Sequence, residues 1–482
     1  MKINLLLVFT AILLSGVLND LKAQKDSTQL VSTWKTNNNG ISNDSSILIN
    51  TDTNYTYNYD VDWNDDGVFD SLGVTGNITH QYNDTGIYTI RIRGVFPSIK
   101  FGGQIIQDRE KLVSFDQWGT AAWLDVEQAF YNCNNMTYAA ADVPNLSIVT
   151  STKEMFFGAL NFNGNINNWN VSNIQNMRSM FFDCFVFNQP LNNWDVSSVT
   201  NFYGFLGGAY NFNQPINNWD VSSAIDMTAM FGFAANFNQP LNNWDVSSVT
   251  TMFQMFVVSY KFNQPINNWD VSSVIDMSQM FSFTDSFNRP LDNWQVDSVQ
   301  NMASMFRRAD RFDQNLANWN IVSVNNMVGM FDGSILSVAN YDNLLRSWQT
   351  KPHQLNINFG VQGLNYCNGD SARFNLIADG WTFSGDSLNC ITVGLNDEIG
   401  MKAVEDSAYD LFEVYPNPSH GVLTIKFIEE NKLEIAQLFT YSGQLVKELY
   451  LNETENILSL KDLTKGMYFI KIKGQTKKVI IH

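Results

Sequence analysis

Apolar and polar positions repeat along the middle of the chain with a fixed period of 25 residues. Tryptophan marks this period without a slip, at Trp169, Trp194, Trp219, Trp244, Trp269, Trp294 and Trp319. Phenylalanine keeps the same spacing from Phe162 to Phe312. A period of this length predicts a solenoid, because one coil cannot bury its apolar side without neighbours above and below it.

Within each coil, the pattern predicts a strand followed by a short helix. Trp194 and Val196 alternate with polar neighbours, which is the two-residue period of a strand. Val199, Phe202 and Phe205 follow at three-residue spacing, which is typical of one or two helical turns whose first N–H groups the preceding serines can cap. We therefore expect an α/β solenoid with one parallel strand and one short helix in each coil.

The tryptophan column is predicted to face the core. If Trp194 pointed outward, Asp195 and the equivalent aspartates would be buried in a stack, and buried unpaired carboxylates are too costly. The outer row of the solenoid is then Asn170, Asp195, Asp220, Asp245, Asp270, Gln295 and Asn320. One interpretation of this row is local hydrogen bonding that turns the chain. The other is a strip that binds a cationic or polyhydroxylated ligand.

The repeat resembles a known family. The motif M-F-x5-F-N-Q-P-L-N-N-W-D-V-S-S-V-T is similar to the BspA-like leucine-rich repeat of bacterial surface proteins, over residues 117–390. This resemblance implies a leucine-rich-repeat solenoid used for attachment to an extracellular protein or glycan. The first and last clear copies depart from the motif, as expected of terminal repeats that act as caps.

Short alternating strands are predicted on the N-terminal side, over residues 29–111. Tyr55, Tyr57 and Tyr59 alternate with polar residues, and Tyr88 begins a second strand. The segment resembles a PKD-like β-sandwich through V-D-W at residues 61–63 and G-I-Y-T at residues 86–89. Such modules are spacers or binding domains.

An acidic loop in this segment is a candidate calcium site. Asp62, Asn64, Asp66 and Asp70 place oxygen ligands at alternate positions around a glycine, the pattern of a loop that wraps Ca²⁺. The alternative is an acidic turn with Asx-type hydrogen bonds. The sequence leaves both open, and it predicts no other cofactor.

A second all-β sandwich is predicted at residues 412–482, after a polar linker at residues 391–411. Its V-Y-P-N-P opening and its K-G-M-Y near the end resemble a type A sorting domain of the type IX (Por) secretion system. The resemblance implies recognition by the secretion machinery and transport through the periplasm and across the outer membrane.

The N-terminus predicts export as well. An apolar run follows Lys2, and residues 1–23 read as a signal peptide cleaved between Ala23 and Gln24. No other stretch is apolar and long enough to be a transmembrane segment. In an exported protein, Cys367 and Cys390 are expected to form a disulfide, whereas Cys133 and Cys184 are expected to be free thiols.

Composition excludes some functions and favours others. Acidic residues outnumber basic ones by 47 to 29, a net charge of −18, which argues against nucleic acid as partner. The four histidines lie in different segments, and no hydrolase or phosphate-loop motif occurs. We therefore expect no enzyme but a secreted, surface-displayed binding or adhesion protein. The alternatives are a passive surface-layer or stalk component and an accessory carbohydrate-binding protein.

Overall fold

The computed structural model describes residues 26–102, 107–390 and 412–481, with short gaps at 417–418, 420, 428–433, 441–444, 452 and 473–474. The chain divides into two compact units, residues 1–388 and 389–482, each with its own apolar core. The predicted signal peptide, its cleavage point at Ala23 and Gln24, and the linker at residues 391–411 lie outside the described residues.

The first unit begins with two β-sheets. The larger sheet has the strand order β4-β3-β6-β1-β7-β8, and the smaller one pairs β2 with β5. These strands are β1 (Leu30–Lys35), β2 (Ser46–Ile49), β3 (Asn58–Asp62), β4 (Ser71–Val74), β5 (Ile78–Gln81), β6 (Ile87–Val95), β7 (Leu112–Gln117) and β8 (Thr137–Tyr138), with a 3-10 turn, η1 (Asp108–Glu110), before β7.

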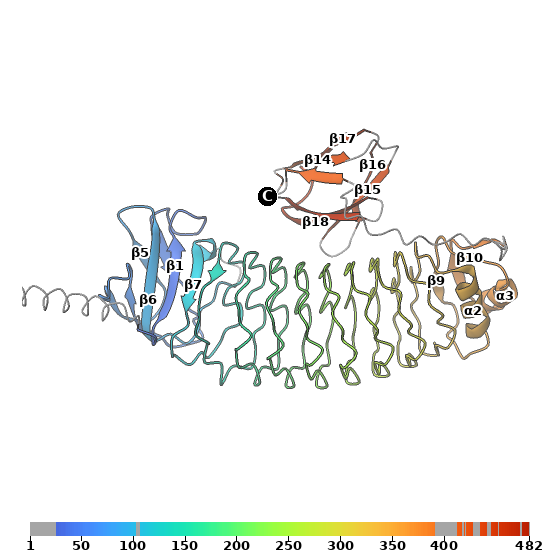
Figure 1. Cartoon of the computed structure of the whole chain (residues 1–482), viewed down its shortest axis with the longest axis horizontal. Helices are drawn as coiled ribbons and strands as arrows, with labels where there is room; N and C mark the ends of the chain where they lie inside the picture. The colour runs from blue at the N-terminus through green and yellow to red at the C-terminus, as the bar shows by residue number, and fades with distance from the viewer. Residues whose placement is uncertain are drawn as a thin grey trace, which may run out of the picture. The chain divides into compact units, whose positions relative to one another are not determined.

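The N-terminal sheet continues directly into the solenoid. Strand β7 pairs antiparallel with β1 on one side and parallel with β8, which belongs to the first coil, on the other. Trp34 and Phe115 of the sheet lie in the same apolar core as Trp169 of the repeats. The N-terminal β-module is therefore the cap of the solenoid and shares its core. Figure 1 shows the sheet beside the first coils.

The prediction of a strand and a helix in every coil is wrong. Residues 161–336 form no helix and no extended strand, only turns joined by single parallel bridges such as Asn176 to Asn201 and Asn201 to Asp226. Where a helix was expected, Met180 N donates to Met177 O (3.2 Å) and Phe182 N donates to Ser179 O (3.3 Å), so the segment is a run of overlapping β-turns. The α/β leucine-rich-repeat assignment is thus corrected to a mostly β and turn solenoid.

The remaining N–H groups of these turns bond to the next coil, which is why no helix forms. Met177 N donates to Asn201 O (2.9 Å), and Ser179 N donates to Tyr203 O (2.7 Å). This geometry needs left-handed residues four positions apart, such as Ser179 (φ 52°) and Asp183 (φ 59°). Left-handed residues end an α-helix, so the three- and four-residue apolar spacing serves stacked turns here.

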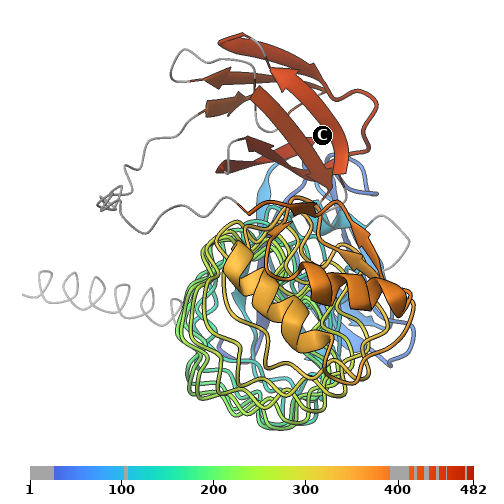
Figure 2. The same ribbon diagram turned by 90° about the vertical axis from the view of Figure 1, so that its right-hand side faces the viewer.

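The predicted core is confirmed. Trp169, Trp194, Trp219, Trp244, Trp269 and Trp294 are each 3% exposed, and Trp319 is fully buried. The rings of Trp219 and Trp244 stack with their planes 1° apart and their centroids 6.4 Å apart. Figure 2 looks along the coils, whose outlines superpose.

Two helices and short strands close the other end of the solenoid. They are α2 (Val338–Trp348), β9 (Asn358–Gly360), β10 (Asn365–Tyr366), α3 (Asp370–Ala378), β11 (Thr382–Ser384) and β12 (Ser387–Leu388). Ser337 caps α2 by accepting a hydrogen bond from Asn340 N. The structure joins Cys367 and Cys390 in a disulfide, while Cys133 and Cys184 are buried free thiols.

The second unit consists of two antiparallel sheets with the strand orders β13-β14-β17 and β16-β15-β18-β19. Its strands are β13 (Phe412–Tyr415), β14 (Val422–Phe427), β15 (Glu434–Thr440), β16 (Leu445–Leu451), β17 (Glu455–Ser459), β18 (Gly466–Ile472) and β19 (Gln475–Ile481). The inner faces of both sheets form one core that includes Leu423, Ile425 and Leu438. This two-sheet arrangement agrees with the β-sandwich expected here.

Candidate functional site: the outer Asx column of the solenoid

The seven polar residues predicted beside the tryptophans form a column on the outside of the solenoid. We call this set the outer Asx column: Asn170, Asp195, Asp220, Asp245, Asp270, Gln295 and Asn320. Six of its members are exposed and Asn320 is half-buried. They are outside because the tryptophans and valines on either side, such as Trp194 and Val196, are buried. The outward position predicted from the sequence is therefore correct, although the strand assumed in that prediction does not form.

Each aspartate of the column turns the chain locally. Asp195 Oδ1 accepts hydrogen bonds from Ser197 N (3.1 Å) and Ser197 Oγ (2.6 Å). Asp220 with Ser222 and Asp245 with Ser247 repeat this pair of bonds. This is the Asx-turn geometry. The observed contacts of the column are therefore the local hydrogen bonds that turn the chain.

The same contacts favour the charged form of two aspartates of the column. The hydroxyl of Ser197, and then its backbone N–H, lower the pKa of Asp195 below its ordinary value. Ser247 lowers the pKa of Asp245 in the same way. Hydrogen bonds to a carboxylate favour its charged form. At neutral pH these side chains are negatively charged and held in one orientation.

Asparagine ladders that the sequence analysis did not identify run parallel to this column. Asn188 N donates to Asn163 Oδ1 (2.9 Å) one coil earlier, and Asn213 N donates to Asn188 Oδ1 (2.9 Å) in turn. Gln264 Nε2 donates to both Asn238 O (2.9 Å) and Asn238 Oδ1 (2.9 Å). The F-N-Q motif therefore satisfies backbone groups between coils through the asparagine Oδ1 and glutamine Nε2 atoms.

The coils also alternate in pairs, which the sequence could have revealed. Ile166, Ile216 and Ile266 precede an Asn-Asn pair in one set of coils. Leu191 and Leu241 precede it in the other, where Leu291 precedes Asp-Asn. Correspondingly, Asn217 Oδ1 accepts from Asn243 N (2.9 Å), whereas Asn242 O accepts from Asn268 Nδ2 (2.6 Å). A search for a 50-residue period would have detected this two-coil unit.

The acidic loop at residues 62–70 is stabilised by its own hydrogen bonds. Asp62 is buried, and its two carboxylate oxygens accept from Asn64 N (3.2 Å) and Gly67 N (2.9 Å). Asp66 Oδ1 accepts from Val68 N (2.8 Å), and Asp70 Oδ2 accepts from Trp63 N (3.3 Å). These contacts are those of the acidic-turn interpretation.

Calcium binding at this loop stays a prediction. Within the described residues, no three carboxylate, histidine or cysteine side chains are grouped as metal ligands, although Asn64 belongs to the proposed set and is not of those types. Because the module shares its core with the solenoid, the test is best made on the whole chain. A calcium-dependent rise in Tm that is lost in Asp66→Ala would support the site.

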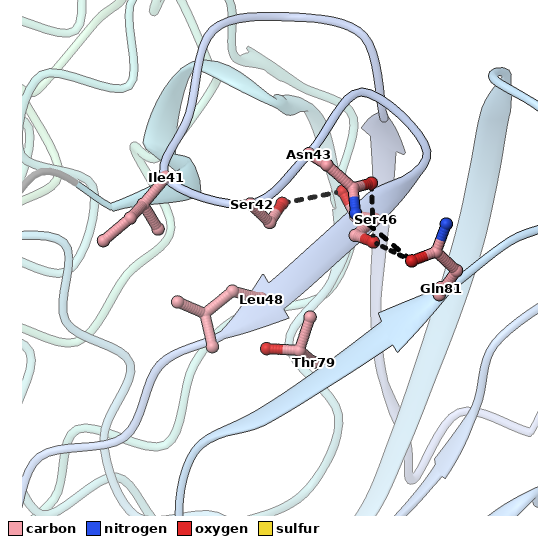
Figure 3. Close-up of a pocket in the computed structure, with 7 residues that line it drawn as sticks. All are labelled: Ile41, Ser42, Asn43, Ser46, Leu48, Thr79 and Gln81. Atoms are coloured by element: carbon pink, nitrogen blue, oxygen red, sulfur yellow. Dashed lines mark hydrogen bonds between the residues drawn. The ribbon is translucent and has the colours of Figure 1, made fainter.

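A shallow pocket of about 350 Å³ lies on the β2-β5 side of the N-terminal module. It is lined by Ile41, Ser42, Asn43, Ser46, Leu48, Thr79 and Gln81 (Figure 3). Its polar atoms bond to one another: Asn43 Oδ1 accepts from Ser46 Oγ (2.9 Å), and Asn43 Nδ2 donates to Gln81 Oε1 (3.2 Å). We assign the pocket no catalytic role.

A fully buried lysine lies behind this pocket. Lys111 Nζ donates to the carbonyl oxygens of Ser42 (3.0 Å), Asn43 (2.8 Å) and Ser46 (3.0 Å). Asp108 is also buried, and its Oδ2 lies 3.9 Å from Lys111 Nζ. Burial lowers the pKa of Lys111, but the three carbonyls favour the ammonium form. The pair therefore ties the loop at residues 42–46 to the start of β7.

The two described histidines are separate from each other and from the outer Asx column. His80 stacks on Trp63, with ring centroids 4.7 Å apart, and burial lowers its pKa. His353 Nε2 lies 3.1 Å from Asp379 Oδ2, and its Nδ1 lies 2.8 Å from Lys351 O. His420 and His482 fall outside the described residues. Neither described histidine has a serine or cysteine nucleophile among its hydrogen-bond partners.

Comparison with protein families identifies the second unit. Residues 413–482 match the family described as "Secretion system C-terminal sorting domain". The second unit is a secretion sorting domain. Its presence shows that the protein is exported, either to the cell surface or to the surrounding medium. Among the described residues, no helix is long and apolar enough to cross a membrane.

The solenoid matches a second family. Residues 124–244 and 226–348 match the family described as "Mycoplasma protein of unknown function, DUF285". These two overlapping matches cover the repeats, so the exported chain carries a repeat domain of this kind. The description names no activity.

Similarity to individual proteins is limited. Beta-agarase A of Zobellia galactanivorans is 24% identical over 149 residues, which are 30% of this chain and 26% of that protein. The chain thus spans about a quarter of the length of this curated relative. No solved structure matches the chain significantly.

Proposed function

We propose that this exported protein is a cell-surface binding protein whose solenoid presents the outer Asx column to an extracellular protein or glycan. The observation that carries the proposal is the arrangement of Asp195, Asp220, Asp245 and Asp270. In each, Oδ1 is held by the serine two residues later. Within the described residues, no hydrogen bond reaches the second carboxylate oxygen of these four, which leaves it available for a partner.

The chemistry of the column favours a cationic or polyhydroxylated partner. Neighbouring carboxylates about 5 Å apart repel by about 0.8 kcal/mol in water. A bound cation or ammonium group would remove this repulsion, and sugar hydroxyls could donate hydrogen bonds to the free oxygens. Because the side chains are already oriented, little conformational entropy is lost on binding.

The test compares two columns of aspartates. Asp220→Asn combined with Asp245→Asn removes two charges from the outer Asx column and keeps a side-chain oxygen for each turn. The matched control is Asp226→Asn combined with Asp276→Asn. These aspartates also accept Asx-turn bonds, from Thr228 N (2.9 Å) and Ser278 N (2.8 Å), but are half-buried outside the column.

Purified wild-type protein and both double variants would be applied to glycan, polyamine and matrix-protein arrays. We expect the first variant alone to lose binding while its unfolding midpoint falls only slightly. Equal binding by all three proteins would assign the column to chain turning only and the ligand to another surface. No binding by any of them would favour a passive stalk or surface-layer component.

A second candidate function is an accessory carbohydrate-binding role. The observation that favours it is the partial similarity to Beta-agarase A, although the chain covers only about a quarter of that protein. Binding to polysaccharides but to none of the protein or polyamine probes would select this role.

The rest of the chain fits the same proposal. The N-terminal module, for which we propose a PKD-like origin, covers the end of the solenoid and keeps its core from solvent. The second unit, proposed to be a type A sorting domain of the type IX system, delivers the chain. We propose a binding role and no catalytic one, so hydrolysis of an array glycan by the purified chain would contradict it.

A further inference from the structure

The sheet β13-β14-β17 of the sorting domain has an apolar residue row on its outer face as well as on its inner face. Its inner face contributes Leu423, Ile425 and Leu458 to the core. On the outer face, Tyr415 pairs across the sheet with Thr424, and Thr424 pairs with Ile457. A sheet with apolar residues on both faces is typical of a sheet that is covered on both sides.

The outer row is exposed in the chain by itself. Ile457 is 78% exposed, Val422 41% and Tyr415 40%. Val422 lies on β14 two residues before Thr424, so these four side chains share one face (Figure 1 labels β14 and β17). Exposed apolar groups that cluster in this way mark surfaces of interaction.

A polar rim borders this row. Glu413 pairs across the sheet with Lys426, and Lys426 pairs with Glu455. Lys426 Nζ lies 2.8 Å from Glu455 Oε1, and both side chains are about half exposed. An apolar centre beside a solvated charged rim is the usual anatomy of a protein–protein interface.

The other sheet is a poorer candidate. This sheet exposes Ile435 and Tyr450, which pair across β15 and β16, and also Leu445 and Val446 of β16. Gln437 Nε2 donates to Glu448 Oε2 (2.7 Å) between the Ile435–Tyr450 pair and Leu445, so this polar pair divides the exposed apolar residues of the sheet into two groups.

We propose that the outer face of β13-β14-β17, centred on Ile457, Val422 and Tyr415, is the surface that a protein of the secretion machinery binds. The family match makes this unit a sorting domain, so it must be recognised by a protein of the export system. The occupant has an apolar patch that covers the central row and polar groups that meet the rim of Glu413, Lys426 and Glu455.

The experiment follows the full-length chain in a bacterium that secretes it. Ile457→Asp places a charge at the centre of the face and leaves the core untouched, because this side chain is exposed. Surface-exposed protein is measured by protease shaving and immunoblotting, and periplasmic protein by fractionation. Tyr450→Asp, on the other sheet, is the matched control.

We expect Ile457→Asp to reduce surface protein by about tenfold or more, the loss that a central interface residue gives, with accumulation in the periplasm. Tyr450→Asp is expected to be exported as the wild type is. The milder variant Ile457→Thr keeps the β-branched shape and is expected to give a smaller loss in the same direction. It provides the readout if Ile457→Asp is degraded.

Several outcomes would overturn the assignment. Normal export of Ile457→Asp and Ile457→Thr would show that this face is not recognised. An equal loss for Tyr450→Asp would show that the effect is not specific to it. If light scattering found purified wild-type chain to be a dimer that Ile457→Asp converts to monomer, the occupant would be a second copy. Ligand binding by the solenoid is measured on purified protein and is independent of all these results.

Discussion

The indole N–H of Trp194 donates to the carbonyl oxygen of Ile166, at 2.9 Å and one coil back along the solenoid. Trp219 bonds to Leu191 in the same way (2.9 Å), and Trp244 bonds to Ile216 (3.0 Å). From Trp194 to Trp319, the tryptophans therefore both fill the core and satisfy a buried backbone carbonyl of the preceding coil. This double role explains why no other aromatic residue replaces tryptophan at these positions.

Replacing one of these tryptophans by phenylalanine should separate the two roles. Trp244→Phe leaves the carbonyl of Ile216 without its partner, and an unsatisfied buried polar group costs about 1–3 kcal/mol. Trp123→Phe is the control, because Trp123 is buried and its Nε1 has no hydrogen-bond partner. In urea denaturation, Trp244→Phe should be the more destabilised of the two. Equal losses of stability in the two variants would show that the tryptophan column contributes through packing alone.

The buried thiol of Cys184 occupies a position where other coils have a hydroxyl. Cys184 Sγ contacts Phe156 O at 2.9 Å, just as Ser259 Oγ contacts Phe231 O at 2.6 Å. Cys184→Ser should therefore stay within about 0.5 kcal/mol of the wild type.

Cys133 provides the contrast for this substitution. It is buried, and within the described residues its thiol has no hydrogen bond. Cys133→Ser should cost about 1–3 kcal/mol, because it buries an unpaired hydroxyl. Equal stability of the two variants in thermal denaturation would show that the acceptor at Phe156 O makes no difference to a serine at position 184.

A side chain at Gly208 should destabilise the solenoid, although the equivalent residues of other coils, such as Asp183 and Phe233, carry side chains at positive φ. Its φ is +69°, and an added Cβ would lie 2.2 Å from Asp183 Oδ1. We expect Gly208→Ala to lower the unfolding free energy by about 1–3 kcal/mol, from the left-handed backbone and the overpacking together. Gly76→Ala is the control, because no atom lies within 4 Å of its added Cβ. If Gly208→Ala leaves the unfolding free energy unchanged, the neighbouring coil must accommodate the added Cβ without destabilisation.

Acid should weaken the solenoid through the outer Asx column. The pKa values of Asp195 and Asp245 are lower in the folded chain than in the unfolded one, where the pKa of an aspartate is about 3.9. Their contribution is therefore complete above that pH and is lost as the pH falls through the folded-state values. Because both side chains are exposed, the effect should be small and reduced by salt.

The serines provide the variants for this test. Ser197→Ala with Ser247→Ala removes the hydroxyl that bonds each carboxylate and should flatten the acid limb of stability against pH. Ser198→Ala with Ser248→Ala, one residue further along, should leave it unchanged. Urea midpoints between about pH 2 and pH 7 would measure the difference. If Ser197→Ala with Ser247→Ala loses as much stability at low pH as the wild type does, other carboxylates cause the acid sensitivity.

Deleting residues 412–482 should leave the first unit folded, since the two units have separate cores. The truncated chain should accumulate in the periplasm, because the sorting domain is missing. Cell fractionation and the Tm of the truncated protein check the two parts. Truncated protein on the cell surface would contradict the sorting assignment.

The sequence by itself determined the solenoid, its period, the inward tryptophans and the sorting domain. The first three follow from burial, because a residue such as Trp194 or Phe187 that recurs at the same position in every coil must lie in a shared core. The sorting domain follows from its V-Y-P-N-P and K-G-M-Y motifs. It also determined that Asp195 and its equivalents face outward, since a stack of unpaired carboxylates cannot be buried.

Only the tertiary structure decided what the backbone does between these positions. The spacing of Val199, Phe202 and Phe205 fits a helical stripe and a run of stacked turns equally well. The choice depends on whether an N–H such as that of Ser179 bonds within its own segment or to Tyr203 in the next coil. In a repeat that stacks on near-identical copies, the neighbouring carbonyl is always in place, so the bonds between coils replace the helix.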